Sequence, residues 1–253
     1  MRRLLSDTLV VTERNLIRLP RAPELLLAFT IQPIMFVLLF RYVFGGAIRV
    51  PGGYAEFLIP GIIVQNIAFG GFVTALGLNE DMHKGLIDRF RSLPMSRAAV
   101  LAGRTSADVV TNGLSMTILI VTGLIIGFSF QTSAVHVILG LVLALTFGYA
   151  FSWVFAFLGL LVKTPEAANS VGFIAVFPLT FISSAFVPGR SLPTPLRQFA
   201  DVNPFTIIVN ELRWLWTGQP SSDQLWQAFA WIVFILLVFS PLAVQRYRRT
   251  ASR

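Results

Sequence analysis

Few side chains in this sequence could carry out chemistry. It has no Cys and only two His, His83 and His136, and neither has neighbours that would complete a metal site. Without Cys there are no disulfides, thiolate metal sites or Cys nucleophile. Proton transfer, nucleophilic attack and metal catalysis all need polar groups that converge on one place. The sequence therefore predicts no enzyme active site, no metal and no cofactor bound by this chain.

A phosphate-binding loop is also absent from the sequence. That loop needs a Lys after Gly and before Ser or Thr, and the only two Lys residues, Lys84 and Lys163, lack this context. If ATP drives this protein, a partner chain must bind the ATP and its Mg²⁺.

The composition indicates a membrane protein. Of 253 residues, 55% are hydrophobic and 13% are charged, whereas soluble domains carry about a quarter charged residues. The net charge of +8 does not point to nucleic acid, because the basic residues gather at the ends of hydrophobic runs, as membrane topology requires. We expect one all-α polytopic domain over residues 1–253, in contact with membrane lipids.

The hydrophobic runs predict six membrane-spanning helices, since about 20 apolar residues cross a bilayer. The uncharged stretch from Val109 to Val162 suits two spans joined by a turn at 129–133, and Pro178 is expected to kink the fifth span. The six predicted spans are Leu25–Phe44, Phe57–Leu78, two within Val109–Val162, Ala167–Val187 and Leu225–Val244.

The basic residues predict the orientation of these spans. Of the 20 Lys and Arg residues, five lie on one side of the membrane, namely Arg41, Arg49, Arg190, Arg197 and Arg213. The others lie with both termini and the 79–108 connection. Because cytoplasmic loops are rich in Lys and Arg, we expect both termini in the cytoplasm.

Two segments flank the spans. Residues 1–23 carry Leu5, Leu9 and Leu16 at helical spacing, which favours a helix in the cytoplasmic interface; a solvated arm is the alternative. Residues 188–224 contain an apolar piece, Phe205–Trp216, that is too short to span. We expect it to form a short re-entrant helix in the outer leaflet, with Trp214 and Trp216, together with Trp226, near the headgroups.

The predicted spans contain polar but no acidic side chains. All 12 acidic residues fall outside them, so a proton relay, which needs an ionisable group at membrane depth, is not expected. Four amides are candidates for a substrate path, with interhelical hydrogen bonds as the alternative: Gln32, Gln65, Asn66 and Asn112.

Two motifs resemble the permeases of type-2 ATP-binding-cassette (ABC-2) exporters, most closely the daunorubicin-resistance permeases that export drugs and lipids. The first is the sequence GLIDRFRSLPMSR at 85–97, within the charged segment 79–108. The second comprises Asn203-Pro204, then Glu211 and Arg213, then Gly218. The resemblance covers essentially the whole chain.

The resemblance implies a function and residue roles. Segment 79–108 would be the coupling helix that docks on the ATPase (nucleotide-binding) subunit, through Glu80, Asp81, Gly85, Asp88, Arg89, Arg91, Pro94 and Arg97. Residues Asn203, Pro204, Glu211, Arg213 and Gly218 would form an extracellular gate. A second permease chain, identical or homologous, would complete the exporter.

Other readings remain at this point. Segment 79–108 also suits a loop whose only role is to set topology. A polysaccharide or glycolipid exporter, an ATP-independent carrier and a membrane scaffold are the alternative functions.

Overall fold

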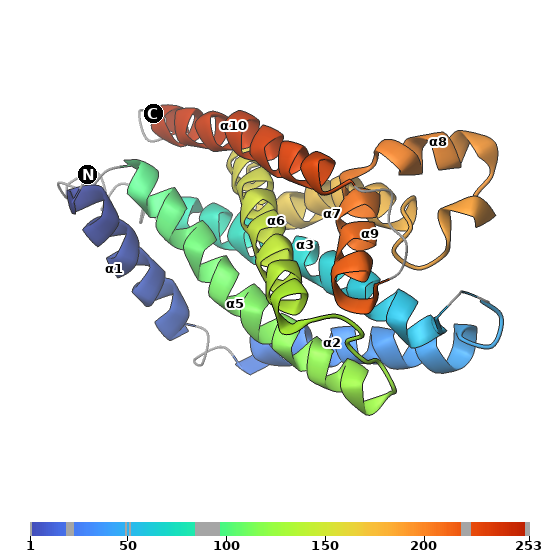
Figure 1. Cartoon of the computed structure of the whole chain (residues 1–253). Helices are drawn as coiled ribbons and strands as arrows, with labels where there is room; N and C mark the ends of the chain where they lie inside the picture. Colours follow the sequence, from blue (N-terminus) through green and yellow to red (C-terminus); the bar gives the residue numbers. More distant parts are fainter. Residues whose placement is uncertain are drawn as a thin grey trace.

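A computed structural model describes residues 2–18, 23–48, 50, 52–83, 97–218 and 224–250. Within these ranges the regular structure is entirely helical (Figure 1). The α-helices are α1 (Arg2–Arg18), α2 (Pro23–Leu39), α3 (Tyr54–His83), α5 (Arg97–Ile125), α6 (Ala134–Leu161), α7 (Pro165–Phe181), α8 (Thr194–Val202), α9 (Pro204–Thr217) and α10 (Leu225–Thr250). A π-helical turn, η2 (Phe40–Phe44), continues α2, and a short 3-10 turn, η3 (Gly189–Ser191), precedes α8.

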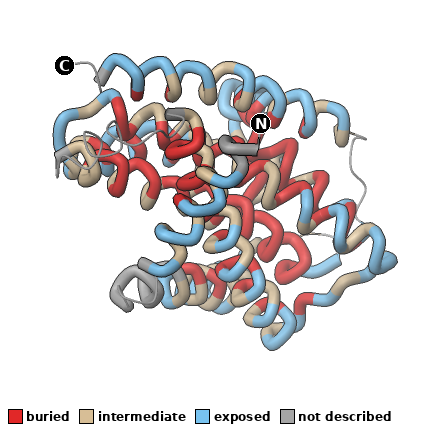
Figure 2. Tube along the Cα trace, turned by 90° about the vertical axis from the view of Figure 1, so that its left-hand side faces the viewer, coloured by how far each residue is buried: buried red, intermediate tan, exposed pale blue. Residues whose placement is uncertain are grey.

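Helix α3 forms the centre of the bundle. It is apolar on every side, as expected of a helix surrounded by protein, and it packs against α2, α5, α6, α7 and α9. Leu58, Ile63 and Ile67 of this helix are fully buried. Helix α10, which leads to the C-terminus, lies on the outside, and its outer side is exposed (Figure 2). Both termini lie at the same end of the bundle (Figure 1).

Four helices within the described residues are long and apolar enough to cross a membrane: Tyr54–Met82, Ala98–Ile125, Ala134–Leu161 and Leu225–Arg249. They contain the predicted second, third, fourth and sixth spans. The turn between the third and fourth is confirmed, because α5 ends at Ile125 and α6 begins at Ala134.

The two other predicted spans correspond to shorter helices. Helix α2 with η2 matches the predicted first span. The prediction for the fifth was wrong at its C-terminal end, since α7 stops at Phe181 and residues 182–187 form turns. Pro178 therefore lies one turn before the end of α7, where its carbonyl oxygen accepts the N–H of Ile182 at 2.8 Å. At 17 residues, α7 is about 25 Å long at the usual rise per residue.

Helix α5 contains a buried acidic residue. It is continuous from Arg97, twelve residues before the predicted start of the third span. Asp108 therefore lies within a long apolar helix, where it is buried and accepts a hydrogen bond from Thr74 of α3. Because this helix of 29 residues is longer than a bilayer crossing needs, the prediction that every acidic residue lies outside the spans stays a prediction.

Helix α1 packs along α5. Gly103 permits the contact, because a Cβ there would lie 2.7 Å from Cβ of Val11, and the Thr12 hydroxyl donates to the Gly103 carbonyl at 3.0 Å. Val11 is buried, whereas Leu9 is 69% exposed. The predicted N-terminal helix is thus present, with a part of its apolar surface directed away from the bundle.

Candidate functional site

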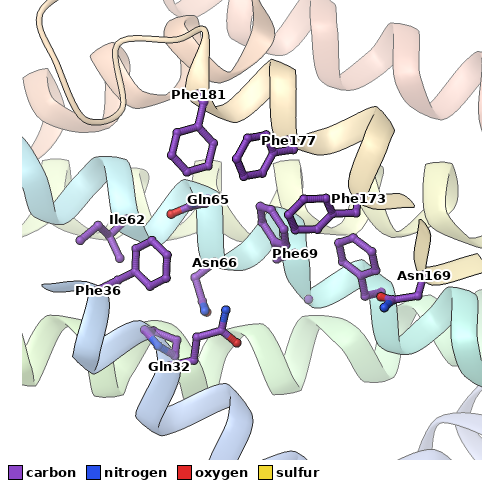
Figure 3. A pocket seen from close by; sticks show the side chains of 13 residues that line it. Gln32, Phe36, Ile62, Gln65, Asn66, Phe69, Asn169, Phe173, Phe177 and Phe181 are labelled. Carbon is purple, nitrogen blue, oxygen red and sulfur yellow. The ribbon is translucent and has the colours of Figure 1, made fainter. Parts of the chain in front are cut away.

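A groove of about 530 Å³ lies between α2, α3 and α7. Helix α3 supplies its wall through residues three or four positions apart, which share one face of a helix. Helix α7 supplies a stripe at every fourth position, in which Phe173, Phe177 and Phe181 stand in a row (Figure 3). The lining residues are Gln32, Pro33, Phe36, Ile62, Gln65, Asn66, Phe69, Gly70, Phe72, Asn169, Phe173, Phe177 and Phe181.

Aromatic rings form most of the apolar surface of the groove. Phe177 stacks on Phe173 with ring centroids 4.8 Å apart, and on Phe181 at 4.2 Å. Phe69 meets Phe173 edge to face at 6.2 Å, so the ring rows of α3 and α7 face each other. Phe173 is 48% exposed, which leaves the groove open on one side. Such a surface suits flat, apolar molecules.

Side-chain amides are the polar component. Gln32 and Asn66 extend into the groove from opposite sides, and Gln65 and Asn169 complete the set (Figure 3). No hydrogen bond joins these four amides to other described residues, and none of the 13 lining residues is charged. Their donors and acceptors are therefore available to a ligand.

The sequence had proposed a fourth path residue, Asn112, in place of Asn169. The structure brings Gln32, Gln65 and Asn66 together but places Asn112 behind the wall of the groove. Asn112 is buried on α5 against Gly70, where a Cβ would lie 2.2 Å from its Oδ1. Asn169, at the first position of the α7 stripe, could have been found from its spacing to Phe173.

The motif Asn203-Pro204 starts helix α9. The Asn203 Oδ1 accepts the N–H of Phe205 at 2.9 Å and so caps the helix, and Pro204 occupies its first turn, where no N–H is needed. The Asn203 amide also donates to the carbonyl oxygens of Leu179 at 2.6 Å and Ile182 at 2.8 Å. These carbonyls belong to the end of α7, where a helix leaves its last acceptors without partners.

Arg213 holds the same part of the chain from the opposite side. Its guanidinium is buried and donates to the backbone carbonyls of Ser184 at 2.7 Å and Ala185 at 3.1 Å. Its Nε donates to the carbonyl of Phe57 at 2.9 Å, and its Cζ lies 3.5 Å from the centre of the Phe57 ring. Asn203 and Arg213 together fix the turns at 182–187, directly after the last ring of the groove.

The remaining residues of this motif complete α9. Gly218 ends the helix with a φ of 65°, the left-handed conformation that Gly adopts without strain. Glu211 is buried and its Oε1 accepts the N–H of Gln224 at 3.0 Å. Trp216 corrects a prediction, because it is fully buried and its indole N–H donates to Val137 at 3.2 Å. Trp214 and Trp226 are exposed.

The predicted coupling segment is described only at its two ends. Glu80 and Asp81 lie in the last turn of α3, and Arg97 is the first residue of α5. Gly85, Asp88, Arg89, Arg91 and Pro94 lie outside the described residues. The two described ends belong to α3 and α5, and an ion pair between Asp81 of α3 and Arg104 of α5 joins these helices at 3.0 Å.

The helices and the groove define a multi-pass membrane protein with an uncharged, aromatic-lined site. Comparison with known families is more specific: the ABC-2 type transporter model matches residues 6–217. The chain belongs to the ABC-2 type transporter family.

Individual relatives agree with this assignment. The chain is 31% identical over 244 residues to a daunorubicin resistance ABC transporter permease protein of Streptomyces coeruleorubidus, covering 96% of this chain and 86% of the relative. It is 23% identical to a probable doxorubicin resistance ABC transporter permease protein of Mycobacterium tuberculosis, with 99% and 91% covered. A putative transport permease of Cyanophora paradoxa is 25% identical, with 84% and 75% covered.

Proposed function

We propose that this chain is the permease subunit of an ATP-driven ABC exporter that moves hydrophobic drugs or lipids out of the cytoplasm or the inner leaflet. The groove between α2, α3 and α7 carries the proposal, because its Phe rings and unpaired amides suit an apolar molecule with a few polar groups. A relative of similar length is named for daunorubicin resistance.

The proposal includes the membrane arrangement. Helices α2, α3, α5, α6, α7 and α10 make six crossings, with both termini in the cytoplasm of a bacterial cell. The short helices α8 and α9 lie on the outer side, and α9 is re-entrant. The apolar surface that α1 leaves exposed, including Leu9, suits the inner headgroup region.

The proposal also assigns partners. A separate ATPase subunit binds ATP and Mg²⁺ and docks on the segment 79–108, and this chain has no ATPase site of its own. A second permease chain pairs with this one. The groove is open on the side where Phe173 and Phe177 are exposed, so this side suits both the partner permease and the substrate path.

The extracellular gate is proposed at the end of α7. Asn203 and Arg213 hold the turns at 182–187 against α9 and α3. Movement of these turns would shift Phe181, the last ring of the groove, and open a path outward.

Co-purification tests the proposed function most directly. The chain is expressed with the ATPase encoded beside its gene, and capture in detergent is compared between wild type and a variant lacking residues 85–97. We expect the wild type to retain the ATPase and the deletion to lose it, while both insert in the membrane. Export of doxorubicin, followed by its fluorescence, should require both subunits.

Two results would contradict the proposal. Failure of the wild type to bind any ATPase would leave transport without an energy source. Full export by charge-reversed variants at Asp88 and Arg89, or by Pro94→Ala, would refute the coupling role of this segment.

A further inference from the structure

A buried set of polar side chains, three of them within the segment 79–108, joins α3 to α5. Arg104 of α5 pairs with Asp81 of α3 at 3.0 Å and donates to the carbonyl of Val73 at 3.1 Å. Four residues later on α5, Asp108 accepts the hydroxyl of Thr74 at 2.6 Å. We call Thr74, Asp81, Arg104 and Asp108 the α3–α5 clamp.

The clamp is built into the helix packing. Arg104 is 7% exposed and Asp108 8% exposed, so both charges are shielded from solvent. Gly77 makes the arrangement possible, because a Cβ there would lie 1.5 Å from Nη2 of Arg104. Any other residue at position 77 would displace the guanidinium from the surface of α3.

Stability alone does not explain these charges. Apolar residues of similar size often hold two helices together at least as well as a buried ion pair, because ions lose their hydration. Polar groups differ in that they bond only in one register, whereas apolar side chains tolerate sliding. The clamp therefore fixes the position of α5 along α3, in addition to holding the helices together.

The position of the clamp links the two candidate sites. On α3, the groove residues Gly70 and Phe72 come first, and the clamp residues Thr74 and Asp81 follow before the helix ends at His83. On α5, which begins at Arg97, the clamp residues Arg104 and Asp108 come next. Asn112, one turn further, lies against Gly70 in the wall of the groove.

We infer that the clamp makes α3 and α5 move as one body, so that displacement of the coupling segment reaches the α3 wall of the groove. The four clamp residues are positioning residues, which touch neither ATP nor the transported molecule. This inference rests on the proposed function. It adds the residues on which coupling between ATP hydrolysis and the groove depends.

The test measures doxorubicin molecules exported per ATP hydrolysed, in vesicles that contain this chain and its ATPase. Thr74→Val keeps the side-chain shape and removes the hydroxyl that donates to Asp108. We expect this variant to lower the ratio about fivefold or more, the lower end of ordinary coupling between sites. ATPase capture and ATP hydrolysis should persist.

Thr111→Val is the matched control. Thr111 lies on α5, and its hydroxyl donates to the Ala107 carbonyl of the same helix at 3.1 Å. The substitution is the same, but no bond between helices is lost. We expect the export ratio of this variant to equal that of the wild type.

A covalent replacement separates positioning from general damage. Because the chain has no Cys, Thr74→Cys combined with Asp108→Cys introduces one thiol pair in place of one clamp bond. We expect the reduced protein to export less doxorubicin per ATP hydrolysed than the wild type. The oxidised protein, in which the two thiols have formed a disulfide and free thiols are no longer detected, should recover the wild-type ratio.

Three outcomes decide between the ideas. A wild-type ratio in Thr74→Val overturns the inference and leaves the proposed function intact. An oxidised thiol pair that stays uncoupled also overturns it. If wild-type chain captures no ATPase, the proposed function fails and the inference fails with it.

Discussion

At the scale of single residues, two members of the motif at 203–218, Asn203 and Arg213, hold the end of α7 and the turns after it. Asn203 caps α9 and binds two carbonyls of α7, and Arg213 binds the turns that follow. Burying a guanidinium costs free energy unless it is hydrogen-bonded, and removing it leaves buried backbone carbonyls without a donor, which also costs free energy. Asn203 and Arg213 are ten positions apart in the sequence, yet both bind the turns at 182–187.

Arg213→Ala should destabilise the protein. Loss of the guanidinium leaves the carbonyls of Phe57, Ser184 and Ala185 without their donor, which should cost about 2 kcal/mol or more. Thermal unfolding in detergent measures the loss. Arg213→Lys keeps the charge but not the fork of donors, so its melting temperature should lie between those of the wild type and Arg213→Ala. A wild-type melting temperature in Arg213→Ala would contradict the assignment. Export should fall while ATPase capture remains.

Asn203 permits a finer separation. Asn203→Ser keeps a cap for α9 but loses the amide that reaches Leu179 and Ile182, whereas Asn203→Ala loses both. We expect Ala to cost about 1 kcal/mol more than Ser, the usual value of a helix cap. Export that falls equally in both would show that the bonds to α7 matter for transport. If Asn203→Ser exports normally, those bonds are not part of a gate.

At the scale of elements, α7 has two different faces. Phe173, Phe177 and Phe181 line the groove, and Ile174, one position after Phe173, is 71% exposed and does not line it. The spacing of four residues puts the rings on one side of the helix. The face of α7 that carries the rings is therefore assigned to the groove, and the face that carries Ile174 is assigned to contact with lipid or another protein.

The ring stripe predicts a matched pair of variants. Phe177→Ala removes a ring stacked on both neighbours and should weaken doxorubicin export several-fold, because ring stacking contributes about 1 kcal/mol per contact. Ile174→Ala removes a similar apolar volume outside the groove and should export normally. Equal effects of the two substitutions would argue against the groove as the substrate path.

At the scale of the whole molecule, the proposed six crossings rest on the charge distribution and the helix order, although α2 and α7 are short. The absence of Cys makes the topology directly testable. Single Cys variants at Gly46, Ser129 and Gln198 should react with a membrane-impermeant maleimide in intact cells. Lys163→Cys should react only after the cells are opened, and labelling of Lys163→Cys in intact cells would refute the orientation.

The sequence by itself determined the class of protein, the four long apolar helices, the lack of a phosphate-loop motif and three of the amides that line the groove. These follow from hydrophobicity, from local spacing and from motifs, all of which are properties of neighbouring residues. It also identified Asn203 and Arg213 without showing what they bind.

Only the tertiary structure decided which polar residues meet. Arg104 and Asp108 belong to the charged segment 79–108 in sequence, and only the structure shows that they are buried against Thr74 and Asp81 on another helix. Asn112 resembled Gln65 but is buried on α5 against Gly70 of α3, and Trp216 resembled Trp214 but is fully buried. Each of these outcomes depends on contacts between residues distant in the chain, which no local pattern encodes.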